Sequence, residues 1–284
     1  MATASKKVKL FVDARYQNEF MKNVHKLHQK EEFTDVTLQS GDVQIQCHRV
    51  VLAVGTTASK KVKLFVDARY QNEFMKNVHK LHQKEEFTDV TLQSGDVQIQ
   101  CHRVVLAVGS DYFKAIFRCG LQKNASDTVE LTMEPEILSS IVDYMYTGDI
   151  ELTVDNVGSL VKACDILQLD ALKDRCEDFM MTQVDVTNCC RFYSLSQLYQ
   201  LHKVPRKAKG LMLTEFKTLA FSDQFKELSS SELIDLIKDD DVNVDDEDIV
   251  VQCVLDWVHH DAVQRKSSLR GSGFLSVHPS TCVT

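Results

Sequence analysis

Residues 87–113, FTDVTLQSGDVQIQCHRVVLAVGSDYF, decide the fold of this 284-residue chain. Two short stretches in which apolar and polar residues alternate, VTL and VQIQC, flank the turn-forming SGD at 94–96. Such alternation around a turn predicts a β-hairpin that buries one face. The apolar runs at 104–108 and 112–117 follow at once, and Ser110 stands where it can cap the second run. We therefore predict a hairpin followed directly by two short helices.

The residues on either side of this stretch extend the prediction. Before it, apolar residues recur at spacings of four, four and three, as in an amphipathic helix of about three turns. These residues are Tyr70, Phe74, Val78 and Leu81. After it, TVELT at 128–132 has the pattern of a short strand, and helical spacing returns at 137–145 and 157–167. Together these elements make a compact α+β unit, which we place at residues 57–184.

The remaining residues are predicted to be helical. The clearest helix carries paired apolar positions every three to four residues at 249–258. Acidic residues at 245–247 precede it, which suits the positive end of a helix dipole. We place an all-α domain at residues 185–269. The last residues, 270–284, show no helical period and are predicted to form an irregular tail.

A second feature of the chain is an identical tandem duplication, since residues 3–55 recur without a difference as residues 57–109. Repeat folds need about three or more units, and their units diverge in sequence. Two identical copies therefore indicate a recent duplication or an error in the recorded sequence. Only the second copy continues into the rest of the unit, so we predict that residues 1–56 are a partial domain, loosely docked or exposing an apolar run. That run consists of Val50, Val51, Leu52 and Val54.

Composition narrows the class of protein. The formal charge of −8 argues against nucleic acid or an acidic membrane as a partner, because such binding needs a basic face. No apolar stretch approaches the roughly 18 residues of a membrane span, and the N-terminal residues lack the apolar run of a signal peptide. The nine cysteines, an odd number, indicate reduced and mostly buried thiols in a cytoplasmic or nuclear protein.

Sequence patterns for catalysis, cofactors and metals are weak. His79 and His82 lie three apart, but no Cys-x-x-Cys pair supports a zinc site. The carboxylates at 239–245 alternate as in a calcium loop, yet valine occupies the sixth and twelfth positions, where glycine and glutamate are needed. The nucleophile pattern Gly-x-Ser-x-Gly does not occur. We predict no catalytic, cofactor or metal site and no small-molecule substrate.

Several strings together resemble one family. FTDVTL at 87–92, CHRVVLAVGSDYF at 101–113 and YMYTGDIEL at 144–152 resemble a BTB (POZ) domain. LIKDDDVNVDDEDIVVQCVLDWVHHD at 236–261 resembles the BACK domain of Kelch-like proteins. The resemblance covers residues 57 to about 270. It implies an α+β BTB/POZ domain, with helices around a small sheet, followed by an all-α BACK domain.

The resemblance also implies a function, that of a non-enzymatic adaptor. In this family the BTB domain forms a homodimer, or pairs with related BTB proteins, largely through its first helix. Together with the start of BACK it docks cullin-3 in a ubiquitin ligase. By resemblance, the dimerisation residues are Tyr70, Phe74, Val78, Leu81, Asp89 and Arg103. The candidates for cullin-3 binding are Tyr112, Phe113, Ile116, Leu121, Lys123 and Tyr146.

Three departures from the family pattern leave a second interpretation open. Residues 121–123 are Leu, Gln and Lys, where the family usually has a hydrophobic residue, any residue and then glutamate. The BACK pattern dissolves after residue 269, which predicts a truncated domain, and no Kelch repeats follow. The alternative function is therefore a dimerising scaffold or dominant-negative fragment that lacks substrate recognition, with cullin-3 binding left open.

Overall fold

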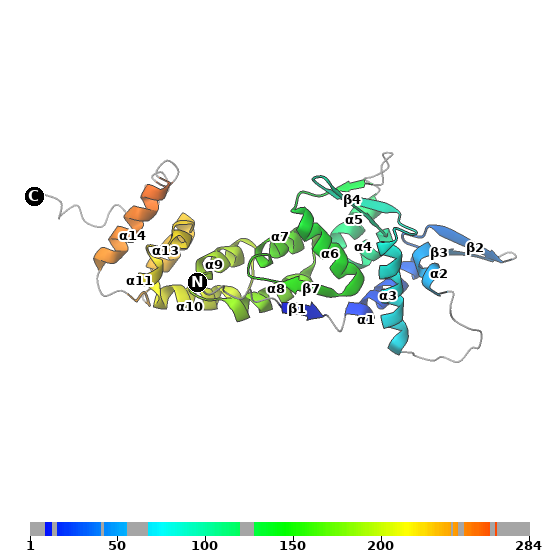
Figure 1. Cartoon of the computed structure of the whole chain (residues 1–284), viewed down its shortest axis with the longest axis horizontal. Coiled ribbons are helices and arrows are strands. Elements are labelled where there is room, and N and C mark those ends of the chain that lie inside the picture. The colour runs from blue at the N-terminus through cyan, green and yellow to red at the C-terminus, as the bar shows by residue number, and fades with distance from the viewer. Residues whose placement is uncertain are drawn as a thin grey trace, which may run out of the picture. The chain divides into compact units, whose positions relative to one another are not determined.

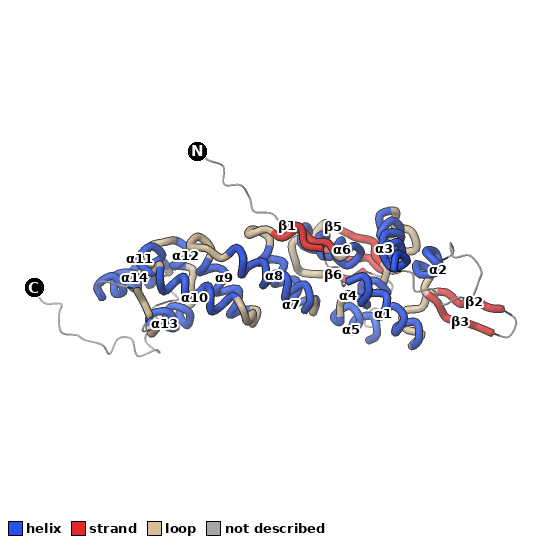
Figure 2. The backbone as a smooth tube through the Cα atoms, turned by 90° about the horizontal axis from the view of Figure 1, so that it is seen from below, coloured by secondary structure: helices blue, strands red, loops and turns tan. Residues whose placement is uncertain are grey.

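The computed structural model describes residues 9–12, 16–40, 43–55, 68–119, 128–239, 241–243, 247–261 and 265. The chain forms two compact units, residues 1–176 and 177–284. The elements of the first unit are β1 (Lys9–Val12), α1 (Tyr16–Gln29), β2 (Val36–Ser40), β3 (Val43–Cys47), α2 (Arg49–Gly55), α3 (Ala68–Gln83), β4 (Val90–Ser94), β5 (Val97–Cys101), α4 (Arg103–Gly109), α5 (Asp111–Cys119), β6 (Thr128–Glu130), α6 (Pro135–Thr147), β7 (Asp149–Leu152) and α7 (Val157–Leu167), as Figures 1 and 2 show. Helix α8 (Asp170–Gln183) crosses the boundary between the units.

The second copy builds the predicted hairpin and extends it into a sheet. Strands β4 and β5 are antiparallel, with Val90 opposite Cys101. Strand β6 joins the other edge of β4 in parallel, so the order is β5-β4-β6. Leu92 in the central strand is fully buried, because the sheet and its covering helices surround it. The predicted hairpin and short strand are confirmed.

Helices pack around this sheet to form the core. Helix α4 lies against α5 and α6, and α6 lies in turn against α3 and α7. Ser110 separates α4 from α5, and its hydroxyl accepts the Phe113 main-chain N–H (3.2 Å) while donating to the carbonyl of Leu167 (2.6 Å). The predicted cap is confirmed, and the same hydroxyl also joins α5 to the end of α7.

The first copy folds into the same local elements but lacks the rest of the domain. Strands β2 and β3 form an antiparallel pair in the same register as β4 and β5, and within the described residues no third strand joins them. Leu38 is therefore 45% exposed, whereas its counterpart Leu92 is 0% exposed. Strand β1 pairs with β7, with Lys9 opposite Leu152, so the first copy also adds a strand to the second.

Two outcomes were predicted for the first copy, loose docking or exposure of the apolar run at its end, and exposure is wrong for two of the four residues of that run. Val50 and Val54 are buried, and Val51 and Leu52 are half-buried. The reason is that α2 packs against α3 of the second copy. The apolar exposure of the first copy lies in its hairpin instead, at Leu38, Val43 and Ile45.

The described part of the second unit is helical. Its helices are the end of α8, α9 (Cys189–Leu198), α10 (Val204–Thr214), α11 (Phe216–Leu219), α12 (Asp223–Lys226), α13 (Ser230–Ile237) and α14 (Glu247–His260). Helix α14 confirms the prediction at 249–258. Its Trp257 is buried, donates a hydrogen bond from the indole N–H to the Leu228 carbonyl (2.8 Å), and lies under the Arg265 guanidinium at 4.2 Å. The predicted tail, 270–284, lies outside the described residues.

None of the helices in the described ranges is both long enough and apolar enough to span a membrane.

Candidate functional site: interaction surfaces of the two copies

The main feature of the first unit is a symmetric contact between the two copies. Helix α1 packs against α4, and α2 packs against α3, while α1 and α3 also meet. Because α1 repeats in α3 and α2 repeats in α4, the first two contacts are the same contact seen twice. In a two-fold symmetric dimer, the same two surfaces meet twice, once on each side of the symmetry axis. The two copies thus pack within one chain as two subunits of such a dimer would.

Tyr16 anchors the first copy on the second. Its hydroxyl donates to the Met145 carbonyl (2.6 Å), and its ring centroid lies 5.1 Å from that of Tyr144. Gly148, at φ +79°, makes room for it, since a Cβ at position 148 would lie 3.1 Å from Cδ1 of Tyr16. Glycine at this position therefore serves both the left-handed end of α6 and the approach of α1.

The apolar stripe predicted for dimerisation, Tyr70, Phe74, Val78 and Leu81 of α3, is repeated in α1 of the first copy. In α1 its last three members, Phe20, Val24 and Leu27, are buried. In α3 the corresponding Phe74 and Val78 are buried and Leu81 is half-buried. Tyr70 belongs to α3, but its side chain lies outside the described part of the structure. A stripe expected to meet a second chain is thus largely covered within one chain.

Asp89 and Arg103, the expected charged pair, come together at the start of α4. The Asp89 carboxylate accepts the main-chain N–H of Arg103 (2.7 Å), and the Arg103 Nε–H donates to the Asp89 carbonyl (3.0 Å). The pKa of Asp89 is raised to about 6, mainly because the carboxyl group is buried. The hydrogen bond from Arg103 lowers this pKa, and the like charge of Asp35 raises it. Asp35 is the counterpart of Asp89 in the first copy. The symmetric contact therefore brings two equivalent carboxylates within electrostatic reach.

The raised pKa of Asp89 predicts a pH dependence of stability. Because the folded state holds the Asp89 proton more tightly than the unfolded chain, stability is expected to fall as pH rises from 3.8 through about 6. The full loss amounts to about 3 kcal/mol. Asp89→Asn, which keeps an acceptor for the Arg103 N–H, is expected to remove this part of the dependence. Thermal unfolding between about pH 4 and about pH 7 measures the difference from the parent chain.

Asp174→Asn provides the control for this prediction, because Asp174 is an exposed carboxylate on α8. Its pH profile is expected to match that of the parent. A profile of Asp89→Asn that also matches the parent would contradict the prediction.

The cullin-3 candidates do not lie on one surface. Tyr112 and Ile116 are half-buried on α5, but Phe113 is fully buried and Tyr146 is 0% exposed. Tyr146 is a core residue. Its hydroxyl accepts a hydrogen bond from the main-chain N–H of His102 (2.9 Å) and donates one to Nδ1 of the His102 imidazole (2.8 Å). Leu121 and Lys123 lie outside the described residues.

Sequence reasoning missed that the first copy reaches helix α5. Glu32 pairs with the Arg118 guanidinium, with both carboxylate oxygens within 2.8 Å of Nη2. The rings of Phe33 and Phe117 meet edge to face, with their centroids 6.0 Å apart. The first copy therefore covers the end of the helix that carries Tyr112 and Ile116. The pattern of the chain gave no signal of this, because residues 32–33 and 117–118 are far apart in sequence.

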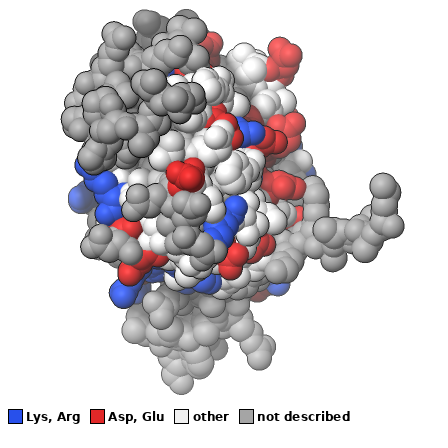
Figure 3. All heavy atoms as spheres, turned by 90° about the vertical axis from the view of Figure 1, so that its left-hand side faces the viewer, with Lys and Arg blue, Asp and Glu red and all other residues white. Residues whose placement is uncertain are grey.

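Charges of both signs are mixed on the molecular surface. Figure 3 shows Lys and Arg side chains lying among Asp and Glu on one face of the molecule. Two lysines of the second unit illustrate this mixing: Lys203 pairs with Asp178, and Lys209 pairs with Asp235 and Asp239.

Comparisons with known proteins agree with this architecture. The family model of the BTB/POZ domain matches residues 24–62 and 78–184 of the sequence. The family model of BACK, "BTB And C-terminal Kelch", matches residues 189–271. The fold is thus that of an α+β BTB/POZ domain followed by a helical BACK domain. The chain belongs to the Kelch-like BTB–BACK family.

The chain is similar to several curated Kelch-like proteins. It is 32% identical to human Kelch-like protein 25 over 246 residues, which are 85% of this chain and 42% of that protein. It is 33% identical to zebrafish (Danio rerio) Kelch-like protein 21 over 202 residues, 71% of this chain and 33% of that protein. The chain thus spans about two-fifths or less of the length of these relatives. Among solved structures, the BTB domain of zebrafish PATZ1 matches 43% of this chain and all of that chain, with 22% identity and a TM-score of 0.40.

Proposed function

We propose that this protein is a non-enzymatic adaptor that joins protein partners, of the kind that serves cullin-3 ubiquitin ligases, and that it works in the cytoplasm or nucleus. The observation that carries the proposal is the match to the BTB/POZ domain, with the three-stranded sheet that the second copy begins, followed by the match to BACK. Helix α5 presents Tyr112 and Ile116, half-buried, as a surface on which cullin-3 would dock. Tyrosine side chains are frequent energetic centres of protein interfaces.

The proposal includes pairing with a second copy of this chain or with a related BTB protein. The surface for that pairing is the one on which α1 and α2 now lie. Since the first and second copies have the same sequence there, a second chain can offer the same residues in place of α1. Pairing would then proceed by exchange of α1 between chains, a form of domain swapping.

A specific observation also favours the alternative function. Glu32 and Phe33 of the first copy lie against Arg118 and Phe117, on the helix that carries the cullin-3 candidates. With Lys123 in place of the family's glutamate, this cover would weaken cullin-3 binding. A chain of this kind would pair with BTB relatives without recruiting the ligase, as a scaffold or a dominant-negative fragment.

Binding to purified cullin-3, measured by calorimetry on the full chain, tests the two functions. The parent is expected to bind at micromolar concentration, and Ile116→Ala is expected to weaken binding by about tenfold, the usual loss for an interface centre. Phe33→Ala is expected to strengthen binding by uncovering α5. Val251→Ala, which truncates an apolar residue that is exposed in the second unit, is the control and is expected to change nothing.

If neither the parent nor Phe33→Ala binds cullin-3, the adaptor function is wrong and the scaffold function remains. Specific ubiquitinated clients recovered with the parent chain would count against the scaffold function.

A further inference from the structure

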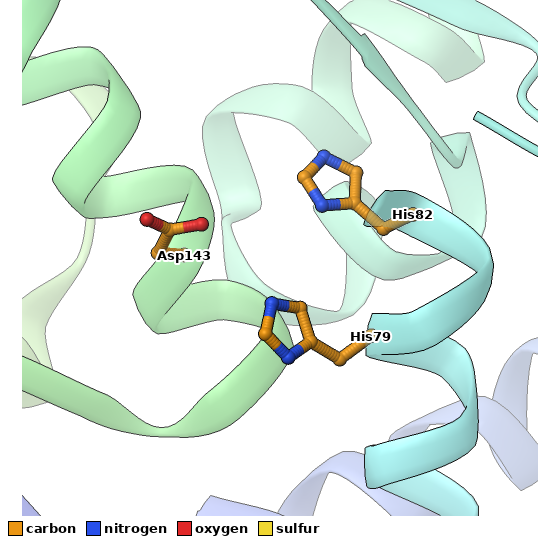
Figure 4. A group of neighbouring side chains, drawn as sticks. All are labelled: His79, His82 and Asp143. Atoms are coloured by element: carbon orange, nitrogen blue, oxygen red, sulfur yellow. The ribbon is translucent and has the colours of Figure 1, made fainter. Parts of the chain in front are cut away.

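Three side chains that can bind a metal gather between α3 and α6. His79 and His82 lie one turn apart on α3, and Asp143 faces them from α6 (Figure 4). One ligand atom from each lies within 4.8 Å of the other two. Within the described ranges, no other group of three or more histidine, cysteine or acidic side chains meets this geometry.

His82 is the least satisfied member of this group. Its Nδ1 is buried and has no hydrogen-bond partner, a rare condition for a buried polar atom. Its ring is stacked on that of Tyr146, with the centroids 4.0 Å apart and the planes 17° apart, which holds the plane of the imidazole. Burial lowers the pKa of His82 to about 4, so the imidazole is neutral near pH 7, the form that binds metals.

The first copy supplies a natural comparison. His25 and His28 repeat His79 and His82 in the same local sequence. There the rings find other neighbours: His25 Nε2 lies 3.0 Å from Gln29 Nε2, and His28 Nε2 lies 4.0 Å from the thiol of Cys47. No carboxylate joins these two rings into a group of three in the described structure. The difference arises from α6, which only the second copy packs against in this way.

We propose that His79, His82 and Asp143 form a zinc site that ties α3 to α6 and leaves a fourth position for water. Two imidazoles and a carboxylate match the ligands of zinc, whereas calcium and magnesium prefer oxygen alone. In a tetrahedral site the ligand atoms lie about 3.3 Å apart, given bonds of about 2.0–2.1 Å. Asp143 is exposed, and its side chain can therefore turn to shorten the present separations. Sequence patterns predicted no such site, because the third ligand comes from a distant helix.

Zinc binding to the metal-free, reduced full chain tests this site. Calorimetry with Zn²⁺ is expected to show one site that Asp143→Asn weakens by roughly tenfold or more, since even the loss of an outer partner of a ligand costs 10–100-fold. Because Asp143 is exposed, this variant is expected to fold as the parent does. The double variant His25→Gln/His28→Gln removes the matching pair from α1 and is expected to bind zinc as the parent does.

A second readout identifies the ligands directly. The imidazole NMR signals of His79 and His82 are assigned as those that vanish in His79→Gln and His82→Gln. When zinc is added to the parent chain, these signals are expected to shift, and those of His25 and His28 are expected to stay. With Co²⁺ as the probe, these nitrogen and oxygen ligands are expected to give no thiolate charge-transfer band. The site does not exist if Asp143→Asn and the parent bind zinc equally. It is also refuted if the His25/His28 variant loses as much affinity, or if the parent binds no zinc.

Discussion

Leu92→Ala is expected to lower the free energy of unfolding of the first unit by about 2–5 kcal/mol, the usual loss for a fully buried leucine. Leu92 lies in the central strand β4 and is 0% exposed. Leu38→Ala makes the same change in the same local sequence of the first copy. It is expected to cost less than about 1 kcal/mol, because much of the Leu38 side chain stays in water. Urea denaturation followed by far-ultraviolet circular dichroism measures both losses.

Hydrogen exchange gives a check within the same experiment. Peptides spanning 38–47 and 92–101 have the same mass in the parent, but either substitution makes them distinguishable. In Leu38→Ala, the β5 amides are expected to exchange more slowly than those of β3, because β4 and β5 belong to the three-stranded sheet. If the β3 and β5 amides exchanged at equal rates, or if Leu38→Ala and Leu92→Ala lowered stability equally, either hairpin could occupy the position of the other in the fold, which would contradict the prediction.

Phe20→Ala is expected to release α1 from the second copy and to turn the chain into a dimer. Phe20 is buried, and truncating a buried phenylalanine lowers stability by about 3–5 kcal/mol. Here the free energy that is lost is that of the packing of α1 on the second copy. The surface left open fits α3 of a second chain, which repeats the sequence of α1 and keeps its phenylalanine at Phe74. Light scattering is expected to show the mass doubling with protein concentration, and trypsin is expected to cut faster at Lys22, Lys26 and Lys30.

Two controls sharpen this prediction. Leu38→Ala is expected to leave both the mass and the rate of trypsin cleavage unchanged. Tyr16→Phe keeps the ring but removes the bond to Met145, so it is expected to weaken docking by only about 1 kcal/mol. If Phe20→Ala is cut faster by trypsin but remains a monomer, the pairing surface is wrong. If the parent is already a dimer, α1 is supplied by the second chain.

Much of the fold could be predicted from local patterns. The alternation in VTL and VQIQC, the SGD turn between them and the Ser110 cap act over a few residues, so a reading of the sequence finds them. The helix around Trp257 was equally clear, because its apolar spacing fits one turn after another. Exposure of the run at the end of the first copy, one of its two predicted outcomes, is wrong for Val50 and Val54, because their burial depends on contact with α3, which no local pattern records.

The candidate sites could be predicted less well. Phe113 and Tyr146 have the side chains of interface residues, and only their packing shows that they belong to the core. The cover of Glu32 over Arg118 and the approach of Asp143 to His79 join residues that are distant in sequence. Contacts of this kind follow from the arrangement of whole helices.

The duplication separates what sequence and tertiary structure each determine. Both copies form the same helix, hairpin and second helix, since short-range propensities and alternation act alike on identical residues. The identical leucines at 38 and 92 differ in burial, and the identical His48 and His102 differ in partners. Nδ1 of His102 meets the Tyr146 hydroxyl, whereas Nδ1 of His48 is buried without one. The order of the sequence already indicated which copy continues into the domain, because β6 and α6 follow only the second copy. Only the tertiary structure decided which of the identical residues are buried and which partners they bind, because burial and hydrogen bonding depend on contacts with β6 and α6.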